Sequence, residues 1–176
     1  MLGPAQRQWL KRELLTSTAP VKVICSGSEF QSNGTADSWA SFKRERDDLL
    51  DFLKDAEISG VLLVSGDRHF TAAYQVREKW IEVTAGPIGS RNAETKNLQE
   101  MFLNYTPTKS KFYCIYDINT RVRPPLVTLE VYRVGEGLAE RRRFTWDEVT
   151  GKTKIKTLPV PKKEAEQPKP KPAETH

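Results

Sequence analysis

The chain has 176 residues, of which 38% are hydrophobic and 29% are charged, as in an ordinary globular protein with one core. Its net charge of +5 is spread along the chain, and only Arg141 to Arg143 forms a tight basic cluster, so we expect no nucleic acid partner. No apolar run is long enough to cross a bilayer. We therefore expect no membrane association, and a cytoplasmic location for the chain as given, or export if a signal precedes Met1.

The first 34 residues predict a helix, a strand and a loop. Pro4 suits the first turn of a helix, and apolar side chains then recur at helical spacing, which predicts a helix over residues 4–16. A β-branched run over residues 21–25 predicts a buried strand. The polar residues 31–34 then predict an exposed loop.

The two cysteines, Cys25 and Cys114, each lie inside an apolar run. They do not have the CxxC spacing of a zinc knuckle or a thioredoxin-like redox pair. We therefore expect both to pack as small hydrophobic side chains in the core.

A second helix and a central strand follow. The side chain of Asp37 or Ser38 can cap a helix, and apolar residues from Trp39 to Leu53 recur at spacings of three and four. The next apolar run, residues 60–64, is hydrophobic on both faces, as a central strand must be. Strand, loop, helix and central strand in this order predict an α/β layer.

Beyond residue 70 the pattern is mostly that of β-strands. Partial alternation of β-forming residues predicts strands over residues 72–76, 80–84, 112–118, 126–134 and 142–149. A brief helical signal covers residues 94–102. From residue 158 the chain has almost no apolar side chains, so we expect a disordered tail over residues 158–176 after a folded part over residues 1–157.

Asp67 and His69 directly follow the most apolar strand. In open α/β sheets, ligands bind outside the carboxyl ends of the strands, and residues two apart in an extended segment point to the same side. A carboxylate and an imidazole that converge in this way suit iron, manganese or zinc, although a hydrogen-bonded loop histidine is the alternative. The only other histidine, His176, lies in the predicted tail, so any imidazole chemistry depends on His69.

Arg68 stands between these two residues. Its guanidinium group matches the geometry of phosphate, but alternation along an extended segment turns its side chain away from those of its neighbours. We therefore expect Arg68 to form a structural salt bridge. For Arg141 to Arg143 we expect a solvated strand.

Four short motifs follow one another along the chain: Leu2-Gly3-Pro4-Ala5-Gln6-Arg7-Gln8-Trp9-Leu10, Val21-Lys22-Val23-Ile24, Asp37-Ser38-Trp39 and Val64-Ser65-Gly66-Asp67-Arg68-His69. In sequence and spacing they resemble the alkaline phosphatase D (PhoD-like) family, and the likeness continues through Glu82 to Pro87. The resemblance implies an α/β fold, the second half of a calcineurin-like metallophosphoesterase sandwich, with a mixed sheet flanked by helices and a β-rich C-terminal part. Residues 1–157 would then form a partial PhoD-like domain.

The resemblance also implies a function, the hydrolysis of phosphate monoesters or diesters with metal ions, iron and calcium among them. His69 matches the family's late histidine ligand, Asp67 matches the acidic residue of the same turn, and Asp37 falls in a motif that borders the site. Asp67 and His69 are thus the expected catalytic residues, and all three are expected metal ligands. Asp37 can equally serve as a helix cap, and Trp39 as a buried core aromatic.

The early acidic and asparagine motifs of the family would precede the segment that resembles residues 1–16, and neither GDxxD nor GNHD occurs in the chain. Two hypotheses remain. In the first, the chain is the C-terminal part of a phosphoesterase, either a truncated gene product or half of a split enzyme, and is inactive without the missing N-terminal half. In the second, it is a non-catalytic module whose exposed strands bind a partner.

Overall fold

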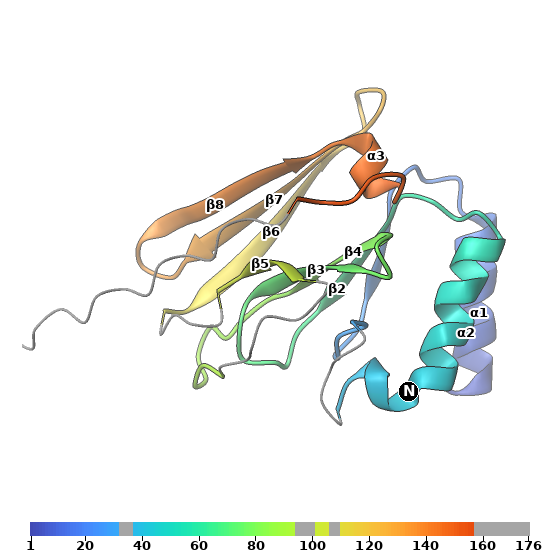
Figure 1. Cartoon of the computed structure of the whole chain (residues 1–176), viewed down its shortest axis with the longest axis horizontal. Helices are drawn as coiled ribbons and strands as arrows, with labels where there is room; N and C mark the ends of the chain where they lie inside the picture. The colour runs from blue at the N-terminus through green and yellow to red at the C-terminus, as the bar shows by residue number, and fades with distance from the viewer. Residues whose placement is uncertain (32–36, 94–100, 106–109, 157–176) are drawn as a thin grey trace, which may run out of the picture.

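Three layers make up the fold in the computed structural model, which describes residues 1–31, 37–93, 101–105 and 110–156 (Figure 1). The helices α1 (Pro4–Thr16) and α2 (Lys43–Asp55) cover one face of a five-stranded sheet, and a three-stranded sheet covers the other face. Both predicted helices are confirmed, although a short 3-10 turn, η1 (Trp39–Phe42), precedes α2.

The five-stranded sheet is mixed, with the order β1-β2-β4-β3-β5. Its strands are β1 (Lys22–Cys25), β2 (Val61–Ser65), β3 (Ala72–Val76), β4 (Trp80–Thr84) and β5 (Met101–Asn104). The neighbours β1, β2 and β4 run parallel, while β3 is antiparallel to both β4 and β5. The carboxyl ends of β1, β2 and β4 therefore meet at one edge of the sheet, the lower edge in Figure 1.

The second sheet is an antiparallel meander of β6 (Phe112–Asn119), β7 (Leu126–Arg133) and β8 (Gly137–Phe144). Along β6, exposed residues alternate with residues that face the first sheet, because only one face of this meander is covered. The strands predicted over residues 112–118 and 126–134 are confirmed. In β8 the run Arg141 to Arg143 lies on a largely solvated strand, as expected.

Successive side chains of β2 pack into two separate hydrophobic cores. Leu63 packs with α1 and α2, whereas Leu62 packs with the second sheet. Both side chains are fully buried, and this is why β2 needs an unbroken apolar run and not an alternating one. The prediction of a central strand is confirmed.

Two predicted elements are wrong near their ends. The strand expected over residues 142–149 stops at Phe144, because Thr145 and Glu148 form a reciprocal capping box that starts the helix α3 (Trp146–Val149). Of the helix expected over residues 94–102, Met101 and Phe102 instead begin β5, and residues 94–100 lie outside the described residues. The predicted tail, residues 158–176, lies outside them too.

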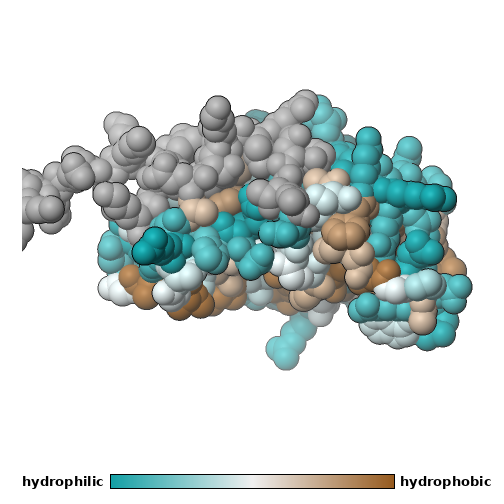
Figure 2. Space-filling model, turned by 90° about the horizontal axis from the view of Figure 1, so that it is seen from below, coloured by the Kyte–Doolittle hydropathy of each residue, from teal (hydrophilic) through white to brown (hydrophobic). Residues whose placement is uncertain are grey.

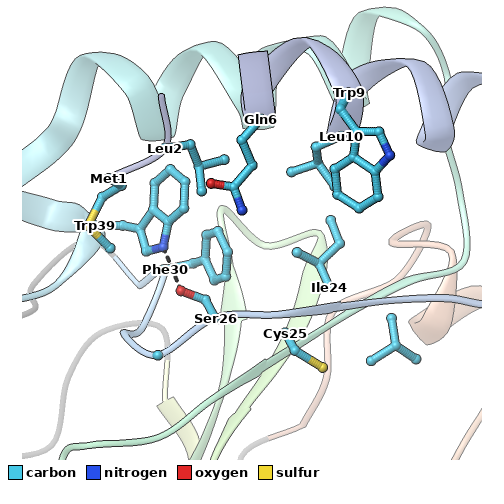
Figure 3. A pocket seen from close by; sticks show the side chains of 12 residues that line it. Met1, Leu2, Gln6, Trp9, Leu10, Ile24, Cys25, Ser26, Phe30 and Trp39 are labelled. Atoms are coloured by element: carbon cyan, nitrogen blue, oxygen red, sulfur yellow. Dashed lines mark hydrogen bonds between the residues drawn. The ribbon is translucent and has the colours of Figure 1, made fainter. Parts of the chain in front are cut away.

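The strand β1 was expected to be buried, but it is the edge strand of the sheet. Only Ile24 is buried, while Val23 is 47% exposed and Cys25 is exposed. The expectation that Cys25 packs in the core is therefore wrong, because its side chain points to the side of this edge strand away from α1 (Figure 3).

Cys114 is half-buried, and burial raises the pKa of its thiol to about 12. Gln31, expected in an exposed loop, is fully buried, and residues 32–34 lie outside the described residues.

Across the described residues, no helix combines the length and the apolar character that crossing a membrane requires.

Gly60 gives a test of this packing, since it holds a left-handed backbone (φ +69°) just before β2. A Cβ atom added there would lie 2.1 Å from the carbonyl oxygen of Pro20, which is a backbone atom and cannot easily move. We expect Gly60→Ala to lower the free energy of unfolding by at least about 2 kcal/mol, measured by urea denaturation. Gly89→Ala is the matched control, because a Cβ there meets nothing within 4 Å, and a similar loss in both variants would contradict the assignment.

Candidate functional site

The turn that follows β2 carries both residues predicted to be catalytic. Asp67 and His69 are exposed, and both have left-handed backbone angles, with φ values of 65° and 57°. The segment is thus not extended as expected, so alternation does not explain where its side chains point. A left-handed conformation costs an ordinary residue about 1 kcal/mol or more, and the surrounding contacts must offset that cost.

The segment after β4 supports this turn from one side. The backbone N–H of Ala93 donates to the carbonyl oxygen of His69 at 2.8 Å. The hydroxyl of Thr71 donates to the carbonyl oxygen of Gly86 at 2.9 Å and accepts from the N–H of Gly86 at 3.2 Å. The turn is therefore tied at two points to residues 86–93.

Arg68 supports the turn from the inside. Its guanidinium group forms an ion pair with the fully buried Glu29 at 2.9 Å and lies over the ring of Phe70, 5.3 Å from the centroid. Glu29 also accepts from the Gln31 side-chain amide at 2.9 Å and from the Tyr74 hydroxyl at 3.3 Å. The structural salt bridge expected for Arg68 is confirmed.

A second buried carboxylate, Glu82, lies on β4 in the same layer. It accepts hydrogen bonds from the backbone N–H groups of Phe30 and Gln31 at 2.8 and 2.9 Å and from the Ser65 hydroxyl at 2.7 Å. Burial raises the pKa of Glu82 to about 7, although these donors oppose the shift. Burial and the charge of Glu29 likewise raise the pKa of Tyr74.

Sequence reasoning did not single out Glu29, and it noted Glu82 only as part of a motif. One signal was available for Glu82, which is the single charged residue in a β-forming run that is buried throughout its five residues. For Glu29, a residue of a polar loop, the sequence carries no comparable signal.

Asp37 and Trp39 come from the same motif but have different environments. Asp37 is exposed, and the side chain of Ser38 is the one that caps η1, accepting from the N–H of Ala40 at 3.2 Å. Trp39 is buried, stacks on Phe30 with 4.8 Å between ring centroids, and donates from Nε1 to the Ser26 hydroxyl at 2.9 Å. Trp39 is thus a core aromatic, the alternative that the sequence left open.

Metal ligation stays a prediction for Asp37, Asp67 and His69. In the described ranges, no three or more His, Cys, Asp and Glu side chains gather closely enough to hold a metal ion. The turn thus offers one carboxylate and one imidazole, a donor set that suits a transition metal but does not complete its coordination.

A pocket of about 410 Å³ lies between α1 and β1 (Figure 3). Gln6, Trp9 and Leu10 of α1 extend toward Ile24 and Phe30, while Cys25 points to the side of β1 away from the helix. Ser26 and Gly27, which also line the pocket, directly follow β1. The pocket thus reaches the edge of the sheet where the parallel strands end.

The raised pKa of Glu82 predicts a pH dependence of stability. Between its ordinary value of 4.5 and about 7, the folded state holds a proton that the unfolded state has released, so the free energy of unfolding falls as the pH rises. The loss contributed by Glu82 is about 3 kcal/mol across this window and is complete above it.

Urea denaturation from pH 4 to pH 8 tests this expectation, with Glu82→Gln as the comparison. As the pH rises from 4.5 to about 7, the free energy of unfolding of the wild type should fall relative to that of the variant. A difference that does not vary with pH would show that Glu82 has an ordinary pKa in the folded protein.

Comparisons with known proteins place this fold. The model of the family described as PhoD-like phosphatase matches residues 1–123, whereas a search of curated proteins finds no match. The solved structure of PhoD superposes with a TM-score of 0.54 at 18% sequence identity, covering 93% of this chain and 38% of that chain. The chain thus spans 38% of the length of that solved protein.

The superposition supports the expected fold, in which helices pack on a mixed sheet and the C-terminal part is rich in β-strands. The helices cover only one face of the mixed sheet, since the second sheet takes the other. Since the family model matches well over half of its residues, the chain belongs to the PhoD-like phosphatase family.

Proposed function

We propose that this chain is the part of a metal-dependent phosphoesterase that carries the Asp67–His69 turn, and that it hydrolyses phosphate monoesters or diesters only together with a complementary N-terminal chain. The family is generally metal-dependent. The observation that carries the proposal is the exposure of both side chains on a supported turn at the carboxyl edge of the parallel strands.

Asp67 and His69 would provide two metal ligands, with Asp37 as a third candidate. Iron and calcium are the metals that the family resemblance implies. A bound ion would polarise the phosphoryl oxygens and lower the pKa of a bound water. The protein's own contribution is to hold the carboxylate and the imidazole at one rigid turn, so that little conformational entropy is lost when an ion binds.

Two observations support the need for a second chain. The first is that a carboxylate and an imidazole leave a transition metal with open coordination positions. This chain covers 38% of the solved PhoD chain, so the matching fold has further residues from which the remaining ligands can come. The second observation is that β1 is an edge strand, because among the described residues no strand pairs with its outer side.

The backbone of β1 is arranged to accept another strand. The N–H groups of Lys22 and Ser26 face the β2 side, where they donate to the carbonyl oxygens of Gly60, just before β2, and Val64. Because bonding alternates along a parallel ladder, the N–H and C=O groups of Val23 and Cys25 point to the outer edge. Trp9, which lines the same pocket as Val23 and Cys25, is 51% exposed. Figure 2 shows the molecule from below, with hydrophobic residues interspersed with hydrophilic ones on that face. A strand of the complementary chain can pair with this edge.

The same edge also favours a second function, that of a non-catalytic module which binds a partner by strand pairing. In that case His69 has no chemical role. The two functions are therefore distinguished by a substitution at His69 that leaves the β1 edge intact.

Hydrolysis of p-nitrophenyl phosphate and of bis-p-nitrophenyl phosphate, with iron and calcium added, tests the proposal. The chain alone should give no turnover above the metal blank. Adding the polypeptide encoded upstream of Met1 should produce turnover, if that sequence contains the acidic and asparagine motifs of the family. An unrelated upstream sequence, or an inactive complex, would contradict the proposal.

In the active complex, His69→Ala should lower the rate by at least about 100-fold, because a direct metal ligand is lost. His176→Ala is the matched control and should have no effect, since it removes the only other imidazole of the chain. If His69→Ala leaves both the rate and the association unchanged, the chain is a binding module.

A further inference from the structure

The turn at Asp67 and His69 needs an anchor, because both residues have a left-handed backbone conformation, which is uncommon for residues other than glycine. Their own side chains are exposed. In the described residues, the inward contact made by a side chain of the turn to a buried charge is that of Arg68, whose side chain is 16% exposed.

The partner of Arg68 is itself fixed in place. Glu29 is fully buried and also accepts from the side chains of Gln31 and Tyr74. Tyr74 belongs to β3, near the middle of the sheet, so the anchor point rests on a rigid element.

The contacts then return to the turn by a second route. The residues after Glu29 donate their backbone N–H groups to Glu82, and Glu82 also accepts from Ser65. Ser65 is the last residue of β2 and stands two residues before Asp67. The turn, the loop at residues 29–31 and the end of β2 thus form a closed ring of polar contacts.

We propose that Arg68 is a positioning residue, whose ion pair with buried Glu29 holds Asp67 and His69 in their left-handed conformations with both side chains toward solvent. What the two residues then do rests on the proposed function, but the positioning does not. Arg68 is no phosphate clamp in this arrangement, because its guanidinium group faces Glu29 and the ring of Phe70.

The main competing interpretation is that the pair contributes only to overall stability. Removing one partner cannot separate the two, since it leaves a buried charge unpaired, whereas removing both charges avoids that penalty. The double variant Arg68→Met/Glu29→Gln should therefore recover the unfolding midpoint lost in Arg68→Met. If Arg68 is a positioning residue, the turn itself should stay released in the double variant.

Nuclear magnetic resonance of the ¹⁵N-labelled chain measures that release, from the intraresidue HN–Hα NOEs of Asp67 and His69, which are strong at positive φ, and from amide exchange over residues 66–71. In both variants that lack Arg68, we expect these NOEs to weaken and exchange to rise at least about tenfold. Arg68→Lys, which keeps a cation near Glu29, should stay closer to wild type.

Arg77→Met is the control, because Arg77 also forms ion pairs, at 2.5 and 2.6 Å, but with Asp47 and Asp51 of α2, which are more exposed than Glu29. It should leave exchange in the turn within about twofold of wild type. Unchanged intraresidue HN–Hα NOEs and unchanged exchange in the double variant would overturn the inference.

Titration with Mn²⁺ of the wild-type chain in complex with the polypeptide encoded upstream of Met1 tests the proposed function separately, because among the described residues the chain alone brings no more than two of the proposed ligands together. The readout is broadening of the His69 ring signals. Release of the turn without any Mn²⁺ effect at His69 would support the positioning inference and count against the metal site. Mn²⁺ broadening at His69 in the wild type, with a turn that is unaffected by removal of Arg68, would do the reverse.

Discussion

The ion pair between Arg68 and Glu29 connects the surface of this protein to its interior, and the geometry of the candidate site depends on it. Glu29 is fully buried, and a charge in that position is tolerated only with a partner and further hydrogen bonds. Tyr74 and Gln31 donate those bonds. Because the buried charge requires Arg68 to point inward, the residues on either side of Arg68 are left at the surface.

Glu82 completes this arrangement from the sheet. Its carboxylate accepts from two backbone N–H groups of the loop after β1 and from the hydroxyl at the end of β2, so these two segments share one acceptor on β4. Such a network specifies one conformation because every member that shifts leaves a buried polar group unsatisfied. The edge that results is rigid, and it holds the exposed side chains of Asp67 and His69, the proposed metal ligands.

The sequence was sufficient where one local pattern decides the structure. The run over residues 60–64 is apolar at every position, which specified a strand covered on both faces, and the helical spacing after Pro4 specified α1 over residues 4–16. It failed where two local signals compete. The segment after Phe144 has β-forming residues, but the Thr145–Glu148 capping box starts a helix there.

The sequence by itself identified the candidate residues of this site, since the positions of Asp67 and His69 after an apolar strand, and the family motifs around them, are local features. Only the tertiary structure decided how these two residues are held. The partner of Arg68 lies 39 positions earlier in the chain, and Glu82 meets the loop at residues 29–31 across a comparable separation. Contacts at such separation depend on the order of strands in the sheet, because β1, β2 and β4 are adjacent in space and not in sequence.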